Sequence, residues 1–161
     1  MKALILYRSY HGNTKTVAEA IGQELTAMGH EHIITDLRKR LPNSAGFDLV
    51  FMGAPTRMAR VTRRALAALK QLQKRGFADK PLALFDTYGP VPTNKEELEK
   101  GKKWLFPGAV GIMERVARQR GLHVFNTTLR CEVTGINGPL AEHEAENAAA
   151  FARAFVSANK R

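Results

Sequence analysis

The chain has 161 residues, of which 44% are hydrophobic and 25% charged, as expected for one globular domain with a full core over residues 1–161. No run of about 18 apolar residues occurs and Met1 leads straight into a strand pattern, which argues against a membrane span and a signal peptide and favours a cytoplasmic protein. The single cysteine excludes an internal disulfide and a cysteine-based metal cluster. The net charge of +10 indicates an acidic protein, nucleic acid or anionic ligand as partner, or simply a solubility adaptation.

Apolar runs and helical patterns alternate along the whole chain. Strands buried on both faces are predicted at residues 3–7, 32–37, 47–53, 81–87 and 122–128. Helices are predicted at residues 13–28, 61–75, 108–120 and 140–158, with a short additional helix at 93–103. This alternation predicts an α/β fold, a doubly wound five-stranded parallel sheet with helices on both faces.

The most informative stretch is the polar segment that follows the first strand. It consists of Ser9, Tyr10, His11, Gly12, Asn13 and Thr14. A buried strand that turns tightly into a helix leaves backbone N–H groups unpaired at the positive end of the helix dipole, which favours a bound phosphate. Ser9, Asn13 and Thr14 add side-chain donors, and Gly12 lets the backbone come close. The alternative is an ordinary turn with N-capping side chains.

Two further polar loops follow strands, at residues 54–60 and 86–93. In open parallel sheets, ligands bind beyond the carboxyl ends of the strands, where the strand order reverses. The three loops converge only if the strand order is 2-1-3-4-5. The rule that connects this order with a binding site is known from other open parallel sheets, and we adopt it as a precedent.

Three motifs in this order resemble the flavodoxin family, whose members bind FMN non-covalently, and the resemblance covers essentially the whole chain. Residues 9–14 are similar to the family's phosphate loop, a Ser or Thr and two variable residues followed by Gly-Asn-Thr. Residues 53–56 resemble the loop that lies along the flavin ring, and residues 86–89 the loop that covers its other side. The resemblance therefore implies FMN as the cofactor.

The expected cofactor-binding residues follow from these motifs. They are Ser9, Tyr10, His11, Gly12, Asn13, Thr14, Pro55, Thr56, Arg57, Met58, Thr87, Tyr88 and Gly89. Backbone groups of residues 55–58 and 87–89 are suited to the polar edge of the ring, while Tyr88 or Met58 is suited to cover a face. Taken singly, these residues are equally consistent with plain turns and a half-buried loop aromatic.

The sequence departs from the family pattern at the second loop. Arg57 stands where many flavodoxins have an aromatic residue, so stacking on that side is not expected to follow the family. Arg57, Arg60, Arg63 and Arg64 make this region basic, whereas flavodoxins are typically acidic around the flavin. The long connection after residue 86 ends in residues 104–106, Trp-Leu-Phe, which either anchor the loop to the core or cover the flavin; anchoring is slightly favoured.

No nucleophile–base pair and no catalytic carboxylate pair is visible, so no catalytic residue is predicted. We therefore expect an FMN-binding electron-transfer protein that docks to an acidic redox-partner protein and not to a membrane. Nucleic acid is disfavoured because no nucleic-acid-binding motif appears. The alternatives are an FMN-dependent oxidoreductase acting on a quinone or other small molecule, and a binding protein that has lost the flavin.

Overall fold

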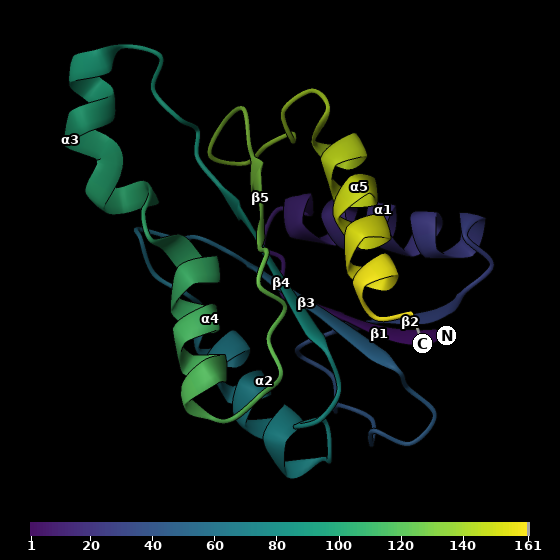
Figure 1. The fold of residues 1–161 in the computed structure, drawn as a ribbon. Helices are drawn as coiled ribbons and strands as arrows, with labels where there is room; N and C mark the ends of the chain where they lie inside the picture. Colours follow the sequence, from purple (N-terminus) through teal and green to yellow (C-terminus); the bar gives the residue numbers. More distant parts are fainter. Residues whose placement is uncertain (161) are drawn as a thin grey trace.

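The fold is described for residues 1–160 from a computed structural model. Its strands are β1 (Lys2–Tyr7), β2 (Glu31–Asp36), β3 (Leu49–Pro55), β4 (Leu82–Tyr88) and β5 (Leu129–Glu132). Its helices are α1 (Asn13–Ala27), α2 (Arg63–Lys74), α3 (Lys95–Leu105), α4 (Gly108–Gln119) and α5 (Glu144–Ala158). The strands form one parallel sheet in the order β2-β1-β3-β4-β5 (Figure 1), which confirms the predicted fold and strand order.

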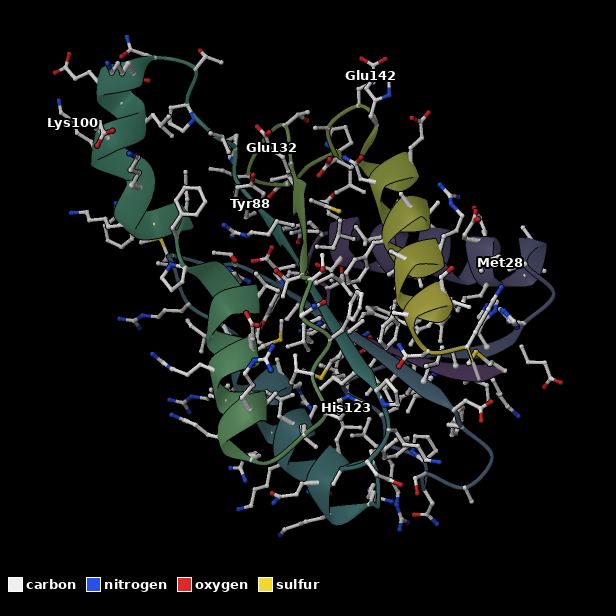
Figure 2. The ribbon with its side chains drawn as sticks, in the orientation of Figure 1. Met28, Tyr88, Lys100, His123, Glu132 and Glu142 are labelled. Carbon is white, nitrogen blue, oxygen red and sulfur yellow. The ribbon has the colours of Figure 1, made fainter. Side chains whose placement is uncertain are left out.

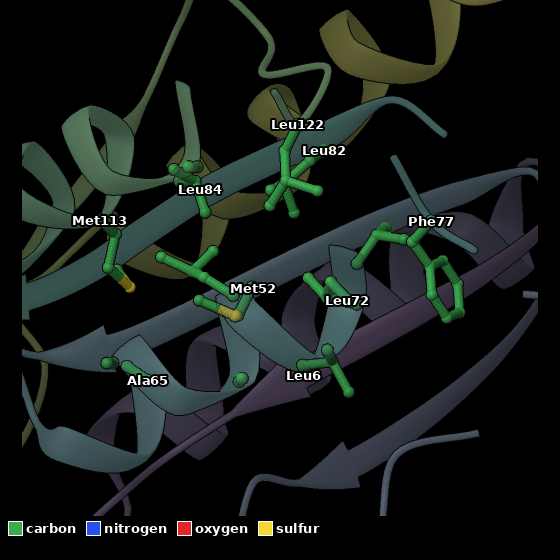
Figure 3. Packing of buried hydrophobic residues seen from close by; sticks show 14 of the residues in the cluster. Leu6, Met52, Ala65, Leu72, Phe77, Leu82, Leu84, Met113 and Leu122 are labelled. Atoms are coloured by element: carbon green, nitrogen blue, oxygen red, sulfur yellow. The ribbon is translucent and has the colours of Figure 1, made fainter. Parts of the chain in front are cut away.

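The sheet separates two layers of helices, α1 and α5 on one face and α2 and α4 on the other (Figure 1). Successive side chains of a strand point to opposite faces, so Leu4 and Leu6 of β1 join one core cluster and Ala3 and Ile5 join the other. Figure 3 shows the first cluster, where Leu6 and its neighbours on the central strands pack against α2 and α4. This two-sided burial explains why the strands are nearly continuous apolar runs.

The last strand differs from the prediction. Residues 122–128 make only an isolated bridge, in which Val124 pairs with Leu82, and the strand forms later, with Leu129 opposite Phe85. Between these two pairings the partner segment advances five residues while β4 advances three, so the extra residues bulge out of the ladder. Leu122 and Val124 are indeed buried, as their apolar character predicts. The strand prediction was wrong because this buried segment does not form continuous backbone pairing with β4.

Helix α3 stands away from the rest of the molecule (Figure 1). It begins after Asn94, whose side chain accepts hydrogen bonds from the backbone N–H groups of Glu96 and Glu97. Leu105 is its one buried residue, while Trp104 and Phe106 are 46% and 47% exposed. Leu105 thus anchors α3, which we call the α3 arm, to the core. No helix within residues 1–160 is long and apolar enough to cross a membrane.

Candidate functional site

A pocket of about 280 Å³ lies at the carboxyl ends of β1, β3 and β4. Its wall is formed by Ser9, Tyr10, His11, Asn13, Thr14, Pro55, Thr56, Arg57, Met58, Thr87, Tyr88, Gly89, Val133 and Ile136. Twelve of the thirteen sequence-predicted site residues are among them, and the remaining one, Gly12, lies in the loop behind the wall. Tyr88 and Glu132 lie at this end of the sheet and His123 at the opposite end (Figure 2). The strand order therefore brings the three loops together.

At the end formed by residues 9–14, the start of α1 offers free backbone donors. Gly12 adopts φ 88°, a left-handed conformation that favours glycine, and its N–H donates to Ser9 Oγ at 3.0 Å. The N–H groups of residues 13–15 belong to the first helical turn, and no acceptor for them exists within residues 1–160. We refer to this region as the anion end, since unpaired N–H groups at a helix start attract anions.

Thr14 is more deeply buried than its expected role as a simple donor implies. Its side chain is 1% exposed, and its Oγ1 lies 2.8 Å from Thr87 Oγ1 in a hydrogen bond that either hydroxyl can donate. This contact joins the first turn of α1 to the end of β4. Thr14 therefore fixes the depth of the pocket as well as contributing a polar atom to its wall.

Two wall residues, Val133 and Ile136, were not predicted from the sequence. They follow β5, and because the predicted last strand ended at residue 128, the loop behind the true strand was not placed at the pocket. In this loop Gly138 has φ 92°, and a Cβ at this position would collide with the side chain of Asn13. The backbone here closes directly over the anion end.

The other end of the pocket contains a tight hairpin at residues 57–60. Arg57 and Arg60 exchange two backbone hydrogen bonds, of 3.0 and 2.9 Å. Met58 and Ala59 between them adopt φ values of 52° and 64°, in the left-handed region that a turn of this kind requires and that Asn-Gly normally supplies. Two adjacent non-glycine residues in this region store strain. The turn presents Met58, 69% exposed, at the mouth of the pocket.

Tyr10 contacts two arginines. The guanidinium carbons of Arg8 and Arg57 are each 4.1 Å from the centroid of its ring. Both guanidinium groups lie within the range of a cation–π contact with this ring. Arg57 is therefore held at the pocket mouth by an aromatic ring, although it remains exposed and forms no ion pair within residues 1–160.

Behind the wall, Asp86 forms a buried network that was not predicted. Its carboxylate is fully buried and accepts hydrogen bonds from Arg130 Nε at 2.9 Å, Thr56 Oγ1 at 2.8 Å and the Val110 N–H at 3.2 Å. Burial raises the pKa of Asp86, while the Arg130 guanidinium, the Thr56 hydroxyl and the Val110 N–H oppose this rise. The network joins the ends of β3, β4, β5 and α4.

Arg130 also supports the aromatic part of the wall. Its guanidinium carbon is 3.9 Å from the ring centroid of Tyr88 and 5.1 Å from that of Phe106. Arg130 does not line the pocket, so Tyr88 separates its charge from the pocket interior. Phe106 packs against Tyr88 at a centroid distance of 6.2 Å and is likewise absent from the wall. The end of the α3 arm therefore buttresses Tyr88.

The protein has an α/β fold with a pocket where the strand order reverses, the position at which open parallel sheets commonly bind ligands. Within residues 1–160, no group of three metal-ligating His, Cys, Asp or Glu side chains exists. The family model described as "Flavodoxin domain" matches residues 4–126, and the chain belongs to the flavodoxin family. Members of this family bind FMN and pass electrons to partner proteins.

Solved flavodoxins have the same fold over the full length. Oxidised flavodoxin 2 from Bacillus cereus is 25% identical, with a TM-score of 0.72 over 98% of this chain and 99% of that one. A flavodoxin from the domain Archaea is 18% identical, with a TM-score of 0.78 over 100% of both chains. The Fusobacterium nucleatum flavodoxin, solved bound to flavin mononucleotide, is 12% identical, with a TM-score of 0.68 over 99% of both chains.

Proposed function

We propose that this chain binds one FMN non-covalently in the pocket and carries electrons between partner proteins. One observation supports this proposal most strongly: a single pocket has two different ends. One end has unpaired N–H groups at the start of α1, and the other has a wall formed by residues 55–58 and 87–89. The first suits a phosphate dianion and the second a flat, largely apolar ring. One anion end argues for FMN rather than FAD.

The donor chemistry of the pocket fits this cofactor. The N–H groups of residues 13–15 and the polar side chains of Ser9 and Asn13 would hold the phosphate, without a charged side chain in the loop. Tyr88, braced by Arg130, offers a ring face. Bound FMN supplies the one- and two-electron chemistry, and the protein orients it and tunes its potential. A pocket of about 280 Å³ is at the small end for such ligands, so part of the ring stays accessible for electron exchange.

The decisive measurement is the visible spectrum of protein purified without added cofactor. We expect flavin absorbance, release of FMN and not FAD on denaturation, and one FMN per chain. Colourless protein that also fails to bind added FMN would overturn the proposal. Steady-state oxidation of NADPH or NADH by a quinone at rates typical of enzymes, about 1 s⁻¹ or faster, would replace the electron carrier with an oxidoreductase.

We further propose that the partner presents an acidic surface to the pocket mouth. Arg57 and Arg60 lie on the exposed hairpin there, and Arg63 follows at the start of α2. Opposite charges steer encounter, and salt screens this attraction. The test compares re-oxidation of the reduced protein by an anionic oxidant, ferricyanide, and a cationic cobalt(III) complex.

Raising salt from about 20 to about 200 mM shortens the Debye length severalfold. We expect it to slow the reaction with ferricyanide about tenfold and to leave the cationic oxidant unslowed. The double variant Arg57→Gln, Arg60→Gln should lose most of this salt dependence. An equal salt response of both oxidants would rule out a basic docking surface at the mouth.

A further inference from the structure

The positive charge of the protein is concentrated in one quarter of the chain. Residues 37–78 contain ten Lys and Arg and a single acid, Asp48, so that nine of the ten net charges lie in this segment. The segment comprises the loop after β2, strand β3, the hairpin and helix α2. The remaining residues are almost balanced in charge. A uniform adaptation to solubility would spread the charge, so this asymmetry calls for a local explanation.

Two adjoining hollows are lined mainly by this segment, away from the pocket that is proposed to bind FMN. The first, of about 460 Å³, is lined by Ile33, Thr35, Lys39, Arg40, Leu41, Pro42, Asn43 and Arg75. The second, of about 380 Å³, is lined by Leu37, Lys39, Arg40, Leu41, Arg64, Ala67, Ala68, Gln71 and Arg75. They share four residues and none with the flavin pocket, and we name them together the basic groove.

The cations of the basic groove have no acid to balance them. Lys39, Arg40 and Arg75 form no ion pair within residues 1–160, and no acid lines either hollow. Arg75 Nη1 lies 3.4 Å from Asn43 Oδ1, while its buried Nε has no hydrogen-bond partner among residues 1–160. Like charges brought together cost free energy unless an anion is bound.

The floor of the basic groove is apolar. Leu37 and Leu41 are each 7% exposed, and Ile33 on β2 is 43% exposed. Strand β2 is the outermost strand of the sheet, so one of its backbone edges is unpaired within residues 1–160. Ile33 and Thr35 are two residues apart and line the same hollow. The groove thus combines a cationic rim, an apolar floor and an open strand edge.

We propose that the basic groove binds an extended acidic peptide segment of a protein partner, with carboxylates on the cationic rim and apolar side chains on the floor. In this kind of binding, called strand addition, the backbone of the peptide pairs with an exposed strand edge and every second side chain faces the groove. Single-stranded nucleic acid fits less well because, in the described part of the chain, no aromatic side chain lines either hollow to stack on bases. A second copy of the chain is disfavoured because two such faces repel each other. The proposal does not depend on the flavin.

The test uses a fluorescent peptide of about six residues, long enough to span ~20 Å as a strand, in which Glu alternates with Leu or Val. Two probes of similar charge accompany it, oligoglutamate and single-stranded DNA. The double variant Lys39→Glu, Arg40→Glu should weaken peptide binding at least about tenfold, in FMN-free and FMN-loaded protein alike. The control Arg115→Glu changes charge at an exposed arginine of α4 and should weaken it less than about twofold.

A second variant tests the apolar floor. Ile33→Thr should weaken the alternating peptide severalfold and leave oligoglutamate unaffected, because the removed contact is apolar. Equal affinity for the peptide and oligoglutamate, tighter binding of DNA, or an equal loss in Arg115→Glu would each overturn the proposal. Flavin content measured on the same samples separates this outcome from failure of the flavin site. Circular dichroism confirms that each variant is folded.

Discussion

The two ends of the pocket are built in different ways. At the anion end, the hydrogen bonds of Ser9 and Thr16 to Gly12 span three and four residues, and the Arg8 guanidinium donates to the carbonyl of Ser9, the next residue in the chain. The other end, which is proposed to face the flavin ring and which we call the ring end, depends on residues far apart in the sequence. Thr56 Oγ1 donates to Asp86, 30 residues on, and accepts from the N–H of Ala109, 53 residues on. Apart from the Thr14–Thr87 hydrogen bond, which spans 73 residues, the first end is held by local hydrogen bonds. The second end is assembled by the tertiary fold around a buried ion pair and carries backbone strain. Substitutions at the anion end should therefore act mainly on FMN affinity, and substitutions at the ring end mainly on folding stability.

The largest effect is expected at the anion end. Thr14→Glu places a carboxylate where the phosphate is proposed to bind, and charge repulsion together with loss of the Thr87 hydrogen bond should cost at least about 3 kcal/mol. This corresponds to a Kd for FMN at least about 100-fold higher. Thr26→Glu, at the exposed far end of the same helix, is the matched control. Full flavin content in folded Thr14→Glu would rule out this loop as the binding site of the phosphate.

At the ring end, a substitution in the buried ion pair is expected to lower the stability of the fold. Arg130→Met keeps an apolar group against Tyr88 but leaves the buried Asp86 carboxylate without its cation. Removing one partner of a buried pair costs about 3–5 kcal/mol, which lowers Tm by roughly 6–20 °C in a chain of this size. Thermal unfolding measures this loss. The double variant Asp86→Asn, Arg130→Met removes both charges and should recover at least half of it.

The same variant gives a pH signature. Without Arg130, burial raises the pKa of folded Asp86 further above the unfolded value of about 3.9. The folded variant then holds a proton that the unfolded chain releases, so its stability is greatest below the unfolded pKa and is lost as pH rises through the folded pKa. The Tm gap between wild type and Arg130→Met should therefore be larger at pH 8 than at pH 4. A constant gap would mean that Asp86 stays solvated.

This contrast also explains what the sequence could predict. The two-sided apolar runs encode strands within a few residues, so the alternation of strands and helices was predicted from the sequence, and the sheet confirms the strand order that was adopted from precedent. The tight turn into a helix at residues 9–14 is also encoded locally, while phosphate binding there stays a prediction. The Asp86–Arg130 pair was not, because the two residues are 44 apart and their pairing depends on the register of β4 with β5. Val133 and Ile136 were missed for a related reason, the bulge that displaces β5.

Relief of the strain in the hairpin at residues 57–60 should have a smaller effect, which raises folding stability instead of lowering it. Replacing Met58-Ala59 by Asn-Gly supplies residues suited to positive φ, as this turn type requires. Relief of strain should stabilise the FMN-free protein by about 1–2 kcal/mol, partly offset by the entropy of the added glycine. Denaturant unfolding measures the gain. Lower stability of the Asn-Gly variant would show that contacts of the Met58 side chain outweigh the backbone strain.

The smallest effect concerns the charge of Arg57, and it distinguishes a tuning residue from a docking residue. Its guanidinium is held on Tyr10 at the pocket mouth, so its positive charge should favour the extra negative charge of fully reduced FMN. Because Arg57 is exposed, the gain is expected to be about 0.5–1 kcal/mol, equivalent to roughly 20–40 mV for a one-electron step. Arg57→Gln should lower the second reduction potential by this amount, measured by potentiometric titration at low salt. Arg63→Gln, which removes an equal charge outside the pocket wall, should shift it much less. Equal potentials in wild type and Arg57→Gln would leave Arg57 a role in docking alone, and the charge of the ring end would then act on the partner and not on the cofactor.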